Sequence, residues 1–174
     1  SVSAVNAAFL VRSSDATAMA AVTAAGDVFL SADLGATWKA ALSTGLALAG
    51  VSAVTFQNGS NTVLWATTAT GSIFKLDTAA TTVAWVAQPT AAALDNGVGI
   101  ASGVATSPVI YALDNNGSLT RLIGDASAAE NIAAATGVTA ATNLFIVPAA
   151  GGNTLWAVTA PKLYTFKDTI AVAV

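Results

Sequence analysis

The residues of this chain that could do chemistry are carboxylates, lysines and hydroxyls. Its 174 residues include six Lys and Arg, nine Asp and Glu, and no His or Cys. The commonest general base and the commonest neutral metal ligand are therefore missing. A serine nucleophile would need a lysine as its base, and no nucleophile–base pair is visible. The sequence predicts a protein that is not an enzyme, and the alternative is a hydrolase that uses an unpaired carboxylate such as Asp95 or Asp114.

One oxygen-rich segment has part of the composition of a calcium loop. Residues 114–118 read Asp-Asn-Asn-Gly-Ser, without the downstream glutamate and the spacing of an EF-hand. The segment aligns with plain turns elsewhere in the chain, which favours an ordinary hairpin turn. We therefore expect no metal and no cofactor.

Two Asn-Gly-Ser sequences begin at Asn58 and Asn116, both in predicted turns. Such sequences accept N-linked glycans when a protein is exported by a cell that glycosylates. They also arise from turn composition alone, so both explanations stay open.

A hairpin pattern of strand, polar turn and strand returns about every 45 residues. Its equivalent positions, 45, 46 and 44 residues apart, are Val28, Ile73, Leu119 and Leu163. The turn position that needs positive φ holds glycine in the first three copies, at Gly26, Gly71 and Gly117. Pro161 replaces this glycine in the fourth copy, which predicts another turn type there.

Each hairpin lies between two further β-like runs, so each repeat has four predicted strands. The preceding runs are 7–11, 51–56, 98–104 and 143–147, and the following runs are 37–42, 83–87, 129–134 and 169–174. Four strands in about 45 residues are typical of a propeller blade. The sequence therefore predicts an all-β fold, a four-bladed β-propeller in one domain (1–174). The predicted blades are about 7–42, 51–87, 98–135 and 143–174, after an N-terminal strand at 1–6.

Several alternatives to this architecture stay open. The run 128–135 is rich in alanine and could form a short helix instead of a strand. We favour a ring that closes within one chain, but two chains could share one eight-bladed ring. A solenoid or a sandwich could use the same strands.

One segment of the first repeat matches a Ser/Thr-x-Asp-x-Gly-x-Thr-Trp pattern in full. The matching residues are Ser31, Asp33, Gly35, Thr37 and Trp38. The segment resembles the Asp-box, or BNR repeat, of sialidase-type propellers, sortilin-type receptors and photosystem assembly factors. This resemblance implies a structural turn in which Asp33 accepts hydrogen bonds from backbone amides, Gly35 allows a tight reversal and Trp38 enters the gap between blades. Only fragments of the pattern recur in the later repeats, near Asp77, Asp125 and Asp168.

The resemblance does not extend to sialidase activity. That site needs three arginines around a carboxylate, together with a Tyr/Glu pair and an acid. This chain has two arginines, Arg12 and Arg121, and one glutamate, Glu130.

Aromatic residues fall at equivalent positions in three repeats, at Trp65, Tyr111 and Trp156. A ring of aromatic side chains around a propeller axis could bind a sugar. Core positions that wedge one blade against the next explain the same spacing, and we favour that interpretation.

The composition predicts a surface that another molecule covers. Charged residues make up 9% of the chain and apolar residues 55%, whereas soluble domains carry roughly 25% charged residues. The simplest covering molecule is another copy of the chain, joined through the strand-like terminal segments 1–6 and 169–174. The six basic residues form no cluster, so we expect no nucleic acid partner. No apolar run approaches the length that spans a membrane.

These observations together predict a non-catalytic structural protein, extracellular or at the cell surface, that self-assembles into a filament or surface layer. Ser1 in place of Met agrees with removal of a targeting segment during export. The alternative is a lectin-like or protein-docking propeller, for which carbohydrate or another protein is the ligand.

Overall fold

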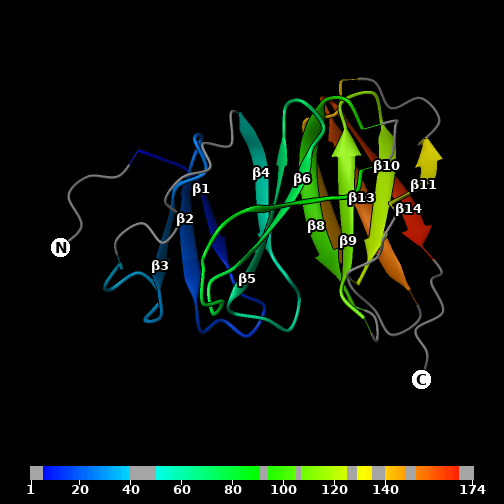
Figure 1. Ribbon diagram of the computed structural model, residues 1–174. Coiled ribbons are helices and arrows are strands. Elements are labelled where there is room, and N and C mark those ends of the chain that lie inside the picture. Colours follow the sequence, from blue (N-terminus) through cyan, green and yellow to red (C-terminus); the bar gives the residue numbers. More distant parts are fainter. Residues whose placement is uncertain are drawn as a thin grey trace.

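Every regular element in the described part of the chain is a β strand. The computed structural model describes residues 6–39, 50–90, 94–104, 107–124, 129–134, 140–147 and 152–168. These residues form four antiparallel sheets, in which each strand pairs with the next strand along the chain (Figure 1). None of them forms a helix that could span a membrane.

The first two sheets come from the N-terminal half of the chain. The first contains β1 (Ala7–Arg12), β2 (Met19–Thr23) and β3 (Val28–Ser31). The second contains β4 (Val51–Phe56), β5 (Val63–Thr68), β6 (Ile73–Asp77) and β7 (Val86–Gln88).

The third and fourth sheets follow in the C-terminal half. The third contains β8 (Gly97–Gly103), β9 (Val109–Asp114), β10 (Ser118–Ile123) and β11 (Glu130–Ala134). The fourth contains β12 (Asn143–Val147), β13 (Asn153–Thr159) and β14 (Lys162–Asp168).

The first three strands of every repeat overlap the runs expected from the sequence, and the last strands differ more. In the second repeat, β7 begins three residues later than the expected run 83–87. In the third, residues 130–134 form a strand, which decides against the helix alternative. In the first, residues 37–39 form no strand, and 40–42 lie outside the described residues. The expected strands at 1–6 and 169–174 also fall outside them, apart from Asn6, which is in no strand.

The hairpin turns have the backbone conformation that the repeated glycines predict. Gly26, Gly71 and Gly117 have φ of 88°, 75° and 90°. Glycine adopts these positive values without the steric cost that a Cβ would add. The first three repeats therefore share one kind of turn between their second and third strands.

Each sheet packs on the next one through alternate residues of its strands. Because successive side chains of a strand point to opposite faces, each sheet has a rear face toward the preceding sheet and a forward face toward the following one. In β5, Leu64 and Ala66 lie on the rear face against the first sheet, and Trp65 lies on the forward face against the third. In β9, Ile110 and Ala112 face the second sheet.

Three hydrophobic clusters join the four sheets in chain order. The first cluster joins the first and second sheets around Trp85, and another joins the second and third around Trp65. The third joins the third and fourth sheets around Tyr111. Among the described residues, none of these clusters contains both the first and the fourth sheet. The four sheets thus form a series, with the first and fourth at its two ends (Figure 1). In the described part of the chain they do not close into the single-chain ring expected from the sequence, because no cluster joins the first sheet to the fourth.

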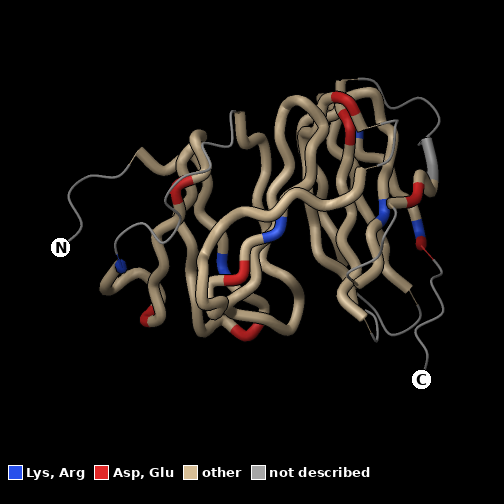
Figure 2. Tube along the Cα trace, in the orientation of Figure 1, with Lys and Arg blue, Asp and Glu red and all other residues tan. Residues whose placement is uncertain are grey.

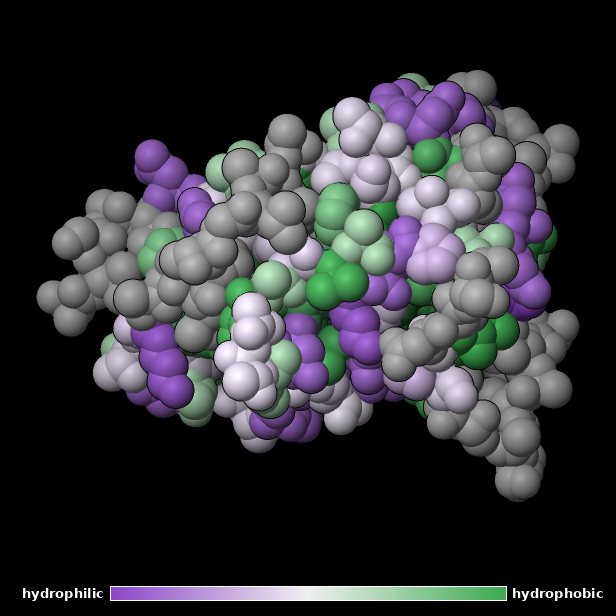
Figure 3. Space-filling view, viewed as in Figure 1, coloured by the Kyte–Doolittle hydropathy of each residue, from purple (hydrophilic) through white to green (hydrophobic). Residues whose placement is uncertain are grey.

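The surface of the described residues carries little charge. Figure 2 shows Lys, Arg, Asp and Glu distributed along the whole series of sheets. On the face shown in Figure 3, hydrophobic and hydrophilic residues are interleaved. Among the described residues, six large hydrophobic side chains are exposed: Leu10, Leu34, Val86, Phe145, Val147 and Leu163.

Candidate functional site

The loop at 31–38 is closed by hydrogen bonds among its own residues. Asp33 Oδ1 accepts from the Ser31 hydroxyl at 2.7 Å and from the Thr37 backbone N–H at 2.8 Å. The Thr37 hydroxyl donates to Asp33 Oδ2 at 2.5 Å. The Gly35 N–H donates to Ser31 Oγ at 2.7 Å, and the Trp38 indole N–H donates to the Gly35 carbonyl at 3.1 Å. In this turn, one backbone amide, that of Thr37, donates to the carboxylate of Asp33.

These bonds fix the charge of Asp33. Its pKa is lowered from 3.8 to about 2, first by the Thr37 hydroxyl, then by the Thr37 N–H and the Ser31 hydroxyl, because all three donate to the ionised carboxylate. A carboxylate of this kind is a poor proton acceptor at neutral pH. The hydrogen bonds that Asp33 accepts hold the loop 31–38 in its conformation.

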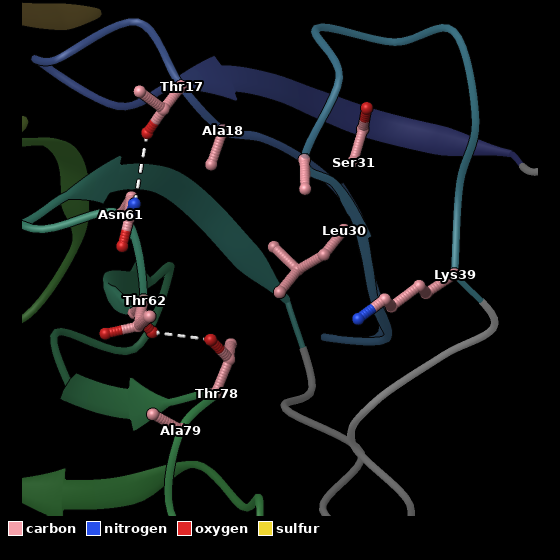
Figure 4. Close-up of a pocket in the computed structure, with 10 residues that line it drawn as sticks. Thr17, Ala18, Leu30, Ser31, Lys39, Asn61, Thr62, Thr78 and Ala79 are labelled. Atoms are coloured by element: carbon pink, nitrogen blue, oxygen red, sulfur yellow. Dashed lines mark hydrogen bonds between the residues drawn. The ribbon is translucent and has the colours of Figure 1, made fainter.

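A groove lies between the first two sheets, beside this loop (Figure 4). Its volume is about 400 Å³, and the residues that line it come from the ends of hairpins in both sheets. The lining residues are Thr17, Ala18, Leu30, Ser31, Ala32, Lys39, Asn61, Thr62, Thr78 and Ala79. Lys39 is the only charged residue among these ten.

Hydrogen bonds between neighbouring turns hold the walls of the groove. Asn61 Nδ2 donates to Thr17 Oγ1 at 3.0 Å and so joins the two sheets across the groove. The Thr78 hydroxyl and backbone N–H both donate to the Thr62 carbonyl at 2.9 Å. The backbone N–H of Lys39 donates to the Leu30 carbonyl at 2.8 Å, which fixes the chain where the lysine side chain starts. The groove thus offers hydroxyl groups, small apolar side chains and one amine.

A second polar cluster, buried except for the half-buried Arg121 and the exposed Glu130, joins the third and fourth sheets. Asp168 accepts from the Tyr111 hydroxyl at 2.7 Å and from Arg121 Nη1 at 2.8 Å. Asn153 Nδ2 donates to the Tyr111 hydroxyl oxygen at 3.0 Å, and Glu130 accepts from Arg121 Nη2 at 2.5 Å. Desolvation by burial, followed by the hydrogen bond to Asp168, raises the pKa of Tyr111. The phenol therefore stays protonated and joins the sheets as a donor.

The two acidic residues considered for hydrolysis do not form an acid–base pair. The Asp114 side chain is buried, and its oxygens accept backbone N–H bonds from Asp95, Asn96 and Asn116 at 3.0, 2.6 and 2.8 Å. Asp114 thus fastens its own turn and the start of β8. Among the described residues, no group of three or more Asp and Glu lies close enough to hold a metal ion.

The repeated aromatic residues lie in two environments. Trp65 and Tyr111 are fully buried between sheets, so they belong to the core. Trp156, on the forward face of the fourth sheet, is half-buried. A sugar-binding ring of all three is therefore ruled out.

The two predicted glycosylation positions both lie in turns. Asn116 is exposed, and Asn58 is half-buried, with its backbone N–H donating to Ser102 Oγ at 2.8 Å. Glycosylation at both remains a prediction.

Trp85 has a structural role between the first two sheets that the sequence pattern indicates only weakly. It is 1% exposed and donates its indole N–H to the carbonyl of Gly26, 59 positions earlier. Its signal is the partial repeat in which Trp85 follows Asp77, much as Trp38 follows Asp33.

Comparison with known proteins supports the architecture. No protein-family model and no curated protein matches the chain. Among solved structures, the chain is similar to one described as YCF48 bound to D1 peptide, with a TM-score of 0.61 and 15% identity. The match covers 89% of this chain and 48% of that one, so this chain spans about half the length of its structural relative. The likeness shows the fold: the chain is an all-β protein of the β-propeller class, which confirms the predicted fold class.

Proposed function

We propose that the chain is a non-catalytic docking module that binds an extended polypeptide segment in the groove between its first two sheets. The observation that carries this proposal is the chemistry of the groove. The ten described residues that line it offer hydroxyls, one amide, one amine and apolar side chains, and none of these ten carries a carboxylate or an imidazole. Such a surface can bind a chain but has no acid–base pair with which to transform it.

An extended peptide suits this groove because its backbone supplies donors and acceptors at regular intervals. The exposed side chains of Thr17 and Asn61 can exchange hydrogen bonds with such a backbone. Lys39 adds a positive charge at one side, which favours a segment with an acidic side chain. The structural relative, as its description states, holds a peptide.

Panning a random-peptide phage library on the purified protein tests this proposal. We expect recovered peptides to contain Asp or Glu and to bind a Lys39→Glu variant about tenfold more weakly, because the substitution reverses the charge. The Lys162→Glu variant is the matched control, since Lys162 is also exposed and lies on β14 of the fourth sheet.

Two results would contradict the proposal. Equal affinity for the wild type and Lys39→Glu would place the peptide elsewhere. A carbohydrate array that yields ligands where the peptide library yields none would instead indicate the lectin-like alternative.

A second candidate is a structural protein, extracellular or at the cell surface, that self-assembles into a filament or layer. It is favoured by the low content of charged residues and by the exposed side chains of Leu10, Phe145 and Leu163. Electron microscopy of the purified protein over a range of concentrations tests it. Regular polymers or closed assemblies would support self-assembly, and single particles at every concentration would contradict it.

If polymers form, deletion of 1–6 tests whether terminal strands join the copies. Polymers that persist unchanged after this deletion would show that the joint lies elsewhere.

A further inference from the structure

The register of the strands defines which residues are equivalent in the four sheets. In the pairing of second and third strands, Val22 lies opposite Val28, Thr67 opposite Ile73, Leu113 opposite Leu119, and Val158 opposite Leu163. In the pairing of first and second strands, Leu10 lies opposite Ala21, Val54 opposite Ala66, Ile100 opposite Ala112, and Leu144 opposite Ala157. Equivalent positions in different sheets can therefore be compared for burial.

The forward face of the fourth sheet has apolar residues where the other sheets have a buried interface. Val28, Ile73 and Leu119 are 0%, 1% and 4% exposed, because the following sheet covers them. The equivalent Leu163 is 62% exposed. Phe145 lies opposite Trp156 on this same face and is 54% exposed.

On the rear face of the first sheet, a position that is buried in the other three sheets is likewise exposed. Val54, Ile100 and Leu144 are 9%, 5% and 5% exposed, because the preceding sheet covers them. The equivalent Leu10 is 61% exposed. Phe29 and Met19 lie on this rear face beside it and are half-buried.

At each of the three contacts between neighbouring sheets, a forward face packs on a rear face. The two exposed end faces are one face of each kind. At each internal interface, a forward face with Val28, Ile73 or Leu119 meets a rear face with Val54, Ile100 or Leu144. The same two classes of position are exposed at the two ends of the series of sheets. Among the described strand residues, each end face carries one charged residue, Lys167 at one end and Arg12 at the other, so burial of apolar surface would dominate their contact.

We propose that the forward face of the fourth sheet packs on the rear face of the first sheet of a second copy of this chain. This inference rests on the self-assembly candidate above and names its joint. The contact continues the blade-to-blade packing, and it is head-to-tail because it joins unlike faces.

Single charge substitutions on exposed residues test the joint without disturbing the core. Leu163→Asp disables the forward end face, and Leu10→Asp disables the rear one. Val86→Asp is the matched control, since Val86 is 58% exposed on β7 and lies on neither end face. Thermal unfolding establishes that all three variants are folded, and analytical ultracentrifugation measures their assembly.

The expected result has two parts. The wild type and Val86→Asp assemble. Leu163→Asp and Leu10→Asp each stay monomeric up to concentrations at least about tenfold above the one at which the wild type assembles. An equimolar mixture of the two monomeric variants forms a one-to-one complex, because one retains an intact rear face and the other an intact forward face. A like-with-like contact could not give this pattern, since a variant altered on the unused face would still assemble.

Three results would overturn the inference. If both end-face variants assemble as the wild type does, self-association stands but uses another joint. If the two variants stay monomeric when mixed, the contact is not head-to-tail. If the wild type itself is monomeric at every concentration, both this inference and the self-assembly candidate are wrong.

Discussion

The indole N–H of Trp85 in the second sheet donates a 2.8 Å hydrogen bond to the carbonyl oxygen of Gly26 in the first. Trp85 is 1% exposed and belongs to the hydrophobic cluster that joins these sheets. One side chain therefore contributes both apolar area and a directional bond to the interface beside the candidate groove.

We expect Trp85→Ala to lower the free energy of unfolding by about 3–5 kcal/mol, the usual range for deletion of a buried aromatic side chain. Urea denaturation followed by circular dichroism measures this loss. Trp38→Ala is the control at the related position of the first repeat, where the indole is half-buried and bonds within its own loop. Equal losses of unfolding free energy in the two variants would show that the contact of Trp85 with Gly26 adds no stability of its own.

Gly71 and Gly59 make a matched pair for separating backbone strain from steric exclusion. Their φ values are +75° and +76°, but a Cβ at Gly71 would lie 1.9 Å from the Leu94 carbonyl oxygen, whereas a Cβ at Gly59 meets nothing within 4 Å. Gly59→Ala should cost about 1–2 kcal/mol for the left-handed backbone alone. Gly71→Ala should cost about 1–3 kcal/mol more, since the backbone near Leu94 must move. Indistinguishable unfolding midpoints for the two variants would contradict the close approach at Leu94.

The low pKa of Asp33 predicts one component of acid sensitivity. Because the pKa is about 2 in the folded chain and 3.8 ordinarily, the stabilisation is complete above pH 4 and is lost as the pH falls toward 2. Thr37→Val removes the largest cause of the shift and should raise the pKa of Asp33. Carboxyl carbon NMR titration measures the pKa directly. A titration midpoint that Thr37→Val leaves at about 2 would show that the Thr37 hydroxyl is not its cause.

Asp168 is expected to be the critical member of the polar cluster between the third and fourth sheets. Asp168→Ala leaves Arg121 and Tyr111 without their shared acceptor and should cost about 3 kcal/mol, as for one partner removed from a buried ion pair. The double variant Asp168→Ala/Arg121→Met should cost less than Asp168→Ala, because it removes the guanidinium that has lost its buried partner. Chemical denaturation of the double variant and both single variants provides the comparison. A double variant whose loss equals the sum of the single losses would show that the two residues are not coupled.

The alternation and turn chemistry of the sequence were sufficient to predict most of the strands. Gly26, Gly71 and Gly117 mark the turns because positive φ is a local requirement, and local requirements are visible in sequence. Trp65 and Tyr111 are buried, as the core interpretation of their repeated position predicts, whereas the equivalent Trp156 in the last sheet is half-buried. The last strand of each repeat was harder to predict, since short edge strands such as β7 are held by few backbone bonds.

The contacts between sheets could not be predicted in the same way. Tyr111 and Asp168 are 57 positions apart, and no spacing rule links a phenol to a carboxylate at that distance in sequence. The groove combines turns from four separate places in the chain, each of ordinary composition. Alternation also predicts which face of a sheet is apolar but not what covers it, and Leu10 and Leu163 lie exposed on such apolar faces.

The serial packing of the sheets has a consequence for how the molecule opens. When a second or third sheet detaches, two interfaces break, whereas loss of the first or fourth breaks one. Stability then behaves as in repeat arrays, a sum of units and nearest-neighbour couplings, so amide protons of the end sheets should exchange first. If further copies dock on both end faces, the amide protons of the end sheets should no longer exchange before those of the inner sheets. In evolutionary terms, a chain built this way can gain or lose one unit at an end while the remaining interfaces stay unchanged.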